Sequence, residues 1–123
     1  MSTFHAVVWI DHTEAHVVMF DHEHVQTQRI QSRSHHKHQG PSDNAPAFFA
    51  EVAQALIGTH EVLLTGPGQT RLAFRTWCNE HHKATANTIV DSIASDHPSD
   101  AQLAAMAKQY FVKFDNMNTP PRG

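Results

Sequence analysis

Four consecutive residues, His35-His36-Lys37-His38, form the densest group of chemically active side chains in the sequence. Neutral imidazoles bind zinc, copper or nickel, and His35 or His36 together with His38 has the spacing to chelate one ion. A structural zinc site needs four fixed ligands, however, and adjacent loop histidines are poorly preorganised. With the nearby Arg33 the same stretch suits phosphates, and imidazole rings can stack on bases. We therefore expect Arg33, His35, His36, Lys37 and His38 to contact RNA and assign no metal ligand; a histidine-rich metal-binding protein and a solvated loop remain the alternatives.

A second candidate is Gly66-Pro67-Gly68, which separates an apolar segment from a segment with helical spacing. Small residues let a backbone approach a ligand, and a helix N-terminus presents free N–H groups and the positive end of the helix dipole. Arg71 belongs to the first turn of that helix. The sequence is neither a Walker loop nor GxGxxG. We expect Gly66, Gly68 and Arg71 to contact an anion or an RNA backbone, with a purely structural turn as the alternative.

Acidic residues at the ends of apolar segments are candidates for a metal-dependent nuclease. Such an enzyme needs several convergent acidic oxygens, because magnesium prefers octahedral hard ligands. Asp11 and Glu51 would be the first two, and Asp96 or Asp100 could compensate for Thr65, which stands where a third acid is expected. The alternative for Asp11 is the start of a hairpin turn. We expect no catalytic residue and no cofactor, and keep the nuclease as the rival function.

Size and composition fit one globular domain. The chain has 123 residues, of which 40% are hydrophobic and 17% charged, enough to bury one core. A formal net charge of −3 with neutral histidines excludes a protein that coats nucleic acid by bulk positive charge. No basic leader or membrane-length apolar run is present, and the single cysteine, Cys78, excludes an intrachain disulfide. We expect a cytoplasmic protein with a buried, inert thiol at Cys78.

The candidate residues must be positioned by two kinds of element. Apolar or alternating segments separated by short polar breaks predict three opening strands at 4–10, 14–20 and 24–30. Residues 31–46 are almost wholly polar and predict a long, exposed and mobile loop. After it, apolar residues at helical spacing predict helices from Phe48 to the region of Gly58, over 69–82, and from Ser99 to Phe114, the last with a capping box. Between these helices, strands are predicted at 61–65 and 84–94.

This succession, β-β-β-α-β-α-β-α, predicts an α/β protein with a five-stranded mixed sheet flanked by helices, which is the ribonuclease H-like fold. The meander should lie on one side of the first strand and two parallel strands on the other. We expect one domain over residues 1–114 and a flexible tail over 115–123. The side chains expected to be mostly buried are Val7, Trp9, Leu56, Leu63 and Phe111.

Three segments together resemble a known family. VVWIDHTEAHVVMF (7–20), EVLLTGPGQTRLAF (61–74) and SDHPSDAQLAAMAKQYF (95–111) look like parts of the middle domain of the Pelota and archaeo-eukaryotic peptide-chain release factor superfamily, and like small bacterial single-domain relatives labelled translational machinery proteins. The resemblance covers most of residues 4–114. It implies a ribonuclease H-like domain and a role in translation, with ribosomal RNA, tRNA or the ribosome as partner.

The predicted loop departs from the release-factor pattern. In release factors the loop after the third strand carries Gly-Gly-Gln, which places a water for ester hydrolysis, whereas the matching residues here are His-His-Lys-His-Gln-Gly. Gln39 is therefore not assigned a catalytic role. Pelota also lacks this motif and acts in ribosome rescue without hydrolysis. The resemblance thus implies a ribosome-associated, non-catalytic function, and we expect neither RNA cleavage nor peptidyl-tRNA hydrolysis.

Overall fold

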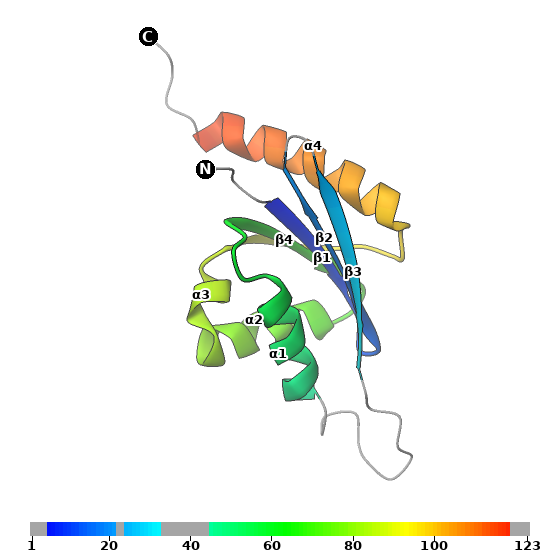
Figure 1. Cartoon of the computed structure of the whole chain (residues 1–123), viewed down its shortest axis with the longest axis vertical. Helices are drawn as coiled ribbons and strands as arrows, with labels where there is room; N and C mark the ends of the chain where they lie inside the picture. Colours follow the sequence, from blue (N-terminus) through cyan, green and yellow to red (C-terminus); the bar gives the residue numbers. More distant parts are fainter. Residues whose placement is uncertain (1–4, 22–23, 33–44, 119–123) are drawn as a thin grey trace.

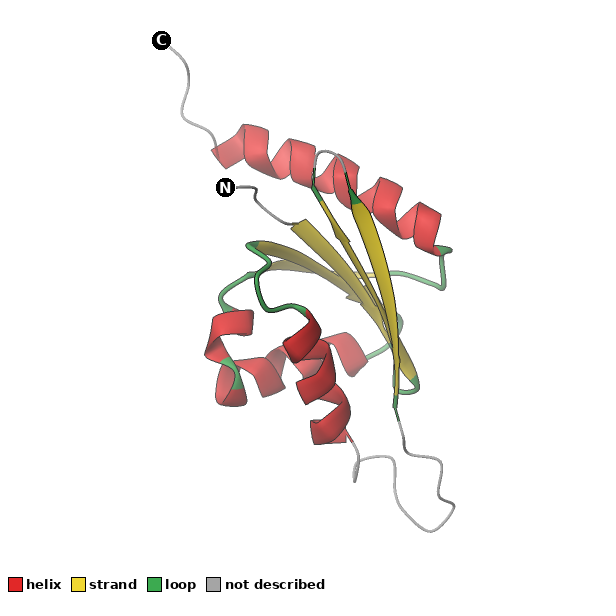
Figure 2. Ribbon diagram, in the orientation of Figure 1, coloured by secondary structure: helices red, strands yellow, loops and turns green. Residues whose placement is uncertain are grey.

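A five-stranded mixed sheet with helices on both faces organises the chain (Figures 1 and 2). The computed structural model describes residues 5–21, 24–32 and 45–118. The strands are β1 (His5–Ile10), β2 (Glu14–Phe20), β3 (Val25–Gln31), β4 (Glu61–Gly66) and β5 (Ile89–Ala94), in the order β3-β2-β1-β4-β5. The β1–β2 and β2–β3 pairs are antiparallel, and the β1–β4 and β4–β5 pairs are parallel. This arrangement confirms the predicted ribonuclease H-like sheet, with the meander on one side of β1.

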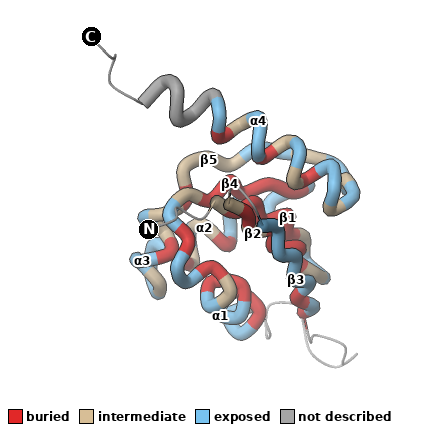
Figure 3. The backbone as a smooth tube through the Cα atoms, turned by 45° about the horizontal axis from the view of Figure 1, so that its top comes forward, coloured by how far each residue is buried: buried red, intermediate tan, exposed pale blue. Residues whose placement is uncertain are grey.

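β1 is central because its side chains are apolar on both faces. Residues 6–10 are at most 1% exposed, as expected for a strand covered on both sides. Figure 3 shows buried backbone along β1 and β4, whereas β3 at the sheet edge is mostly exposed. Val7 and Trp9 point to one face and Val8 and Ile10 to the other, so the strand contributes to two separate cores.

The first face is covered by α1 (Ala45–Ala55), α2 (Thr70–His81) and the short α3 (Lys83–Ala86). Phe49 packs edge-on against Phe74, with ring centroids 5.5 Å apart. Leu56 and Cys78 are buried in the same core, as predicted. Burial raises the pKa of the Cys78 thiol to about 11, so this thiol is inert at neutral pH.

The second face is covered by α4 (Asp100–Asn118). Leu103, Ala107 and Phe111, spaced at helical intervals, pack on Val7 and other apolar side chains of the sheet. The predicted capping box is present at the start of the helix. The Ser99 N–H donates to Gln102 Oε1 at 2.9 Å, and the Gln102 N–H donates to Ser99 Oγ at 3.1 Å. All five side chains predicted to be buried are buried: Val7, Trp9, Leu56, Leu63 and Phe111.

Several element boundaries differ from prediction. The strand expected over 84–94 begins at Ile89, because residues 83–86 form α3. There the Thr85 hydroxyl pairs with His82 Nδ1 at 2.9 Å and the Thr88 hydroxyl donates to the Thr85 carbonyl at 2.7 Å, so local bonds hold a turn in place of a strand. α1 begins at Ala45, before Phe48, and α4 continues to Asn118, past the predicted domain end at residue 114. No helix in the described ranges is long and apolar enough to cross a membrane.

Candidate functional site

One edge of the sheet holds the described part of the predicted site. β1, β3, β4 and β5 run in the same direction, so their carboxyl ends meet at this edge (Figure 1). The β1–β2 hairpin, the end of β3 and the Gly66 turn all lie there, and the Ser32 N–H donates to the Thr13 carbonyl across the first two at 2.8 Å. The polar segment after Ser32 therefore leaves the sheet at the same edge as the Gly66 turn.

The basic and histidine-rich cluster itself lies outside the described residues. Residues 33–44 have no described placement. The flanking elements are described: β3 continues to Gln31 and α1 begins at Ala45, so both ends of the predicted 31–46 loop belong to regular elements. RNA contact stays a prediction for the residues of this cluster, namely Arg33, His35, His36, Lys37 and His38.

Gly66 and Gly68 both have positive φ angles, which explains the glycines in this turn. Gly66 has φ 142° and Gly68 has φ 63°. A Cβ on Gly66 would collide with the Ile10 carbonyl oxygen, whereas one on Gly68 would meet nothing within 4 Å. The close approach that Gly66 permits is therefore to the neighbouring strand β1. This supports the structural alternative for Gly66.

The half-buried Arg71 braces the same turn. Its Nη1 donates to the Gly68 carbonyl at 2.6 Å and to the Gly66 carbonyl at 3.4 Å, and its Nε donates to Ser92 Oγ at 3.0 Å. Arg71 thus joins the β4–α2 connection to β5. The first turn of α2 has no acidic residue, and Gln69 makes no side-chain cap hydrogen bond. No acidic side chain therefore offsets the positive end of the α2 dipole at this turn. The contacts of Arg71 indicate a structural role in holding the turn.

Asp11 occupies a hairpin turn. Its Oδ1 accepts hydrogen bonds from the Thr13 N–H at 2.8 Å, the Thr13 hydroxyl at 2.9 Å and the Glu14 N–H at 2.9 Å. Partial burial opposes ionisation, but these bonds to the carboxylate outweigh it, and the pKa of Asp11 is lowered. Neither Asp11 nor Glu51 belongs to a group of three or more close metal-ligating side chains among the described residues. The contacts therefore support the alternative interpretation, in which Asp11 starts a hairpin turn.

Replacing Asp11 tests this turn. Asp11→Ala should lower the free energy of unfolding by about 1 kcal/mol at pH 7, because it leaves backbone N–H groups without their acceptor. Since the folded pKa is lowered, the carboxylate stabilises the fold above its unfolded pKa, and this contribution is lost as the pH falls through the folded pKa. Asp11→Asn keeps the acceptor oxygen and should lose less. Urea unfolding at pH 7 and near pH 3 measures both effects; equal losses for the two variants would contradict the turn role.

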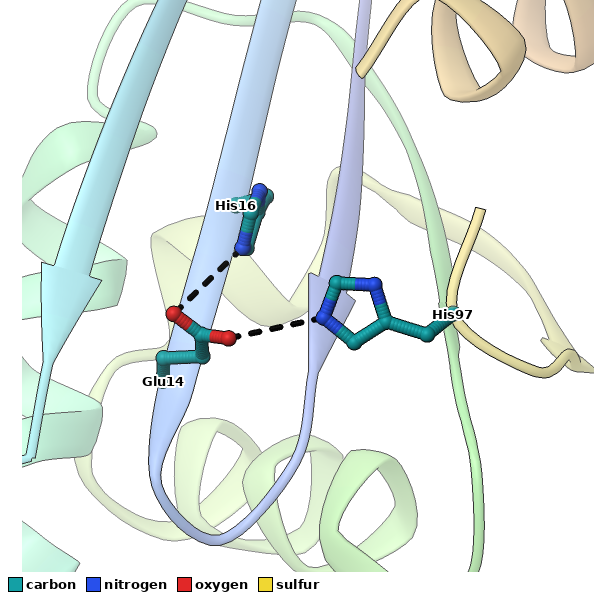
Figure 4. A group of neighbouring side chains, drawn as sticks. All are labelled: Glu14, His16 and His97. Atoms are coloured by element: carbon teal, nitrogen blue, oxygen red, sulfur yellow. Dashed lines mark hydrogen bonds and ion pairs between the residues drawn. The ribbon is translucent and has the colours of Figure 1, made fainter. Parts of the chain in front are cut away.

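A second group, Glu14, His16 and His97, was not predicted from the sequence. One donor atom from each lies within 4.8 Å of the others, and Figure 4 shows Glu14 between the two imidazole rings. Glu14 and His16 point to the same face of β2, a spacing visible in the sequence. His97 comes from the connection between β5 and α4, and no sequence spacing indicates that this connection returns to β2.

Comparisons with known proteins bear on the fold. No family model matches the chain, and none of the curated protein sequences does. Solved structures do match it. Pelota from Archaeoglobus fulgidus is 17% identical, with a TM-score of 0.65 over 90% of this chain and 32% of that chain. The archaeal translation termination factor aRF1 is 9% identical, with a TM-score of 0.64 over 93% of this chain and 39% of that chain.

A yeast protein shows the same likeness. Dom34 from S. cerevisiae is 13% identical, with a TM-score of 0.59 over 91% of this chain and 34% of that chain. The chain thus spans 32–39% of the length of these three proteins. The predicted likeness to Pelota and the release factors is confirmed at the level of the fold.

Proposed function

We propose that this protein is a translation-associated factor that binds ribosomal RNA or tRNA on the ribosome, in the cytoplasm, without hydrolysing peptidyl-tRNA. The observation that carries the proposal is the fold shared with three proteins over nine tenths of this chain. Of these, aRF1 is described as an archaeal translation termination factor. Dom34 is described as a translation termination-like factor involved in RNA quality control pathways. A fold hosts many functions, so the proposal also needs a surface suited to RNA.

The carboxyl edge of the sheet offers such a surface. The segment after Ser32 holds two permanent cations, Arg33 and Lys37, and three histidines within six positions. It leaves the sheet at the edge where the Gly66 turn and the start of α2 also lie. A helix start without acidic residues favours phosphate through its N–H groups. We assign the main contacts to the segment and a supporting contact to the turn, whose shape Arg71 maintains.

Sedimentation with ribosomes tests the function at its coarsest level. The endogenous protein should co-sediment with ribosomes or ribosomal subunits in a sucrose gradient at low salt. Because phosphate contacts are lost as salt rises, it should leave them in high-salt gradients. Protein that stays at the top of the gradient at every salt concentration would contradict a ribosomal role.

RNA binding should strengthen on mild acidification. At pH 7.5 only Arg33 and Lys37 of the cluster carry a full charge, whereas at pH 6 the three histidines become largely protonated, since their reference pKa is about 6.5. Each added phosphate contact steepens the dependence of log affinity on log salt, by about 0.7 per contact for single strands. Affinity for ribosomal RNA fragments should therefore rise from pH 7.5 to pH 6, with a steeper salt dependence at pH 6.

A matched pair of triple variants isolates the cluster. Replacing His35, His36 and His38 by Ala should remove most of the pH response and leave the far-ultraviolet circular dichroism unchanged. The control replaces three exposed histidines away from the carboxyl edge, His24, His60 and His81, by Ala. The control protein loses as many histidines but should keep the wild-type pH response. If the cluster variant binds as the wild type does at both pH values, the segment is not the binding element.

A further inference from the structure

His16 is a buried imidazole with one nitrogen engaged and one unsatisfied. His16 is 5% exposed. Its Nδ1 lies 2.8 Å from Asp100 Oδ1 at the start of α4. Its Nε2 is buried and has no hydrogen-bond partner among the described residues. A carboxylate that accepts a hydrogen bond from Nδ1–H favours the tautomer whose lone pair is on Nε2, which is the arrangement typical of metal-binding histidines.

Two further side chains that could ligate a metal, Glu14 and His97, lie beside His16. His16 Nε2 lies 3.5 Å from Glu14 Oε1, and His97 Nε2 lies 3.4 Å from Glu14 Oε2 (Figure 4). Charge-assisted hydrogen bonds are shorter, at about 2.7–2.9 Å. Two ligand atoms at about 2.0–2.1 Å from one tetrahedral zinc ion lie about 3.3 Å apart. The two contacts are made by different oxygens of Glu14, and one ligand atom from each of the three residues lies within 4.8 Å of the others. Small side-chain rotations would therefore bring the three ligand atoms to the spacing required around one ion.

The protein holds His97 in place without help from a ligand. The Trp9 indole N–H donates to the Asp96 carbonyl, and the Trp9 ring lies 4.2 Å from the His97 ring between centroids. On the side of β5, the Ser95 N–H donates to the Gly66 carbonyl at 3.1 Å. On the side of α4, the capping box fixes Ser99. The connection is therefore anchored on both sides of His97, and its imidazole is preorganised.

The charges around the cluster favour a dication. Glu14 and Asp100 are acidic, and Arg29, whose Nε lies 3.7 Å from Glu14 Oε1, is the cation near them in the described part of the chain. With neutral imidazoles the local charge is negative. Two imidazoles and one carboxylate suit zinc or a similar transition metal, whereas magnesium and calcium prefer oxygen donors alone.

We propose that Glu14, His16 and His97 form a binding site for a zinc-type dication, with Asp100 as the positioning residue behind His16. The three ligands come from β2 and from the β5–α4 connection, so the ion would join the opening hairpin to the segment that leads into α4. Three protein ligands leave one tetrahedral position for water. The proposed ligands include no residue of the histidine cluster at 35–38 and none of the residues assigned to RNA contact.

Zinc titration tests the proposal in a protein that lacks the competing cluster. The parent carries Ala at positions 35, 36 and 38, and isothermal titration calorimetry with Zn²⁺ should give one site per chain. Co²⁺ should bind with the visible absorption of a tetrahedral complex, and Mg²⁺ should give no heat. His97→Ala and Glu14→Gln should each weaken Zn²⁺ binding by at least tenfold. Asp100→Asn should weaken it by about 10- to 100-fold, as loss of a partner behind a ligand does.

His60→Ala, which removes an exposed histidine outside the cluster, is the matched control and should bind Zn²⁺ as the parent does. His97→Ala changes a half-exposed side chain and should keep the fold, so it decides the outcome even if Glu14→Gln is poorly folded. Absence of a one-to-one Zn²⁺ site in the parent would overturn the proposal. Unchanged affinity in His97→Ala, or equal binding of Mg²⁺, would overturn it as well.

Discussion

Gly66→Ala should destabilise the protein by about 3 kcal/mol or more, which is a large share of the 5–15 kcal/mol typical of a domain. Two effects act together. The φ of 142° at Gly66 is strained for any residue with a Cβ. The added Cβ would also collide with the Ile10 carbonyl oxygen of β1. Because the obstacle is backbone in the central strand, it cannot move aside as a flexible side chain would.

Gly58→Ala is the matched control. Gly58 also has a positive φ, 96°, but a Cβ there would meet nothing within 4 Å. Gly58→Ala should therefore lower the free energy of unfolding only through backbone strain, by about 1 kcal/mol. Urea unfolding of the two variants measures the difference. Equal losses would mean that the close approach of β4 to β1 contributes nothing, contrary to the structure.

The same comparison separates two interpretations of the Gly-Pro-Gly turn. A glycine that serves ligand approach would reduce RNA binding when replaced and leave the unfolding free energy nearly unchanged. Because of the contact with Ile10, Gly66→Ala should instead lower the unfolding free energy strongly and change RNA binding little. Gly68, with open space around its α-carbon, is the better position at which to test RNA contact, because Gly68→Ala costs only backbone strain.

Much of the fold could be predicted because the decisive signals are local. The apolar run over 4–10 predicted a strand, and β1, which it forms, is the centre of the sheet. Ser99 and Gln102 predicted the start of α4 by their spacing. Turn glycines marked the end of β4. Each of these features depends on residues within a few positions of one another.

The features that were missed depend on long-range placement or on competing local bonds. Residues 84–86 looked like part of a strand, but hydroxyl groups of Thr85 and Thr88 hold a helical turn. The pairing of His16 with Asp100 joins positions 84 apart in the chain. His97 reaches Glu14 only because the connection after β5 leads back across β4 and β1 to place the start of α4 over β2. Spacing in the sequence carries no signal for such a return.

Trp9 links the core to the proposed metal site, and its replacement should have the second large effect. The side chain is 1% exposed in the core under α4. Trp9→Ala should lower the free energy of unfolding by about 3–5 kcal/mol, the range for a buried aromatic residue. It also removes the indole N–H that holds the Asp96 carbonyl and the ring that packs on His97.

Trp9→Phe separates these two roles. It keeps most of the apolar volume, so it should cost less stability than Trp9→Ala, but it removes the indole donor to the Asp96 carbonyl. If Trp9 preorganises His97, Trp9→Phe should weaken Zn²⁺ binding. By contrast, Phe111→Ala, a core change on α4 three turns after Asp100, should lower stability and leave Zn²⁺ affinity unchanged. Urea unfolding and Zn²⁺ calorimetry on the two variants give both quantities. A proportional loss of stability and affinity in both would show that zinc binding follows global stability, and that Trp9 has no separate positioning role.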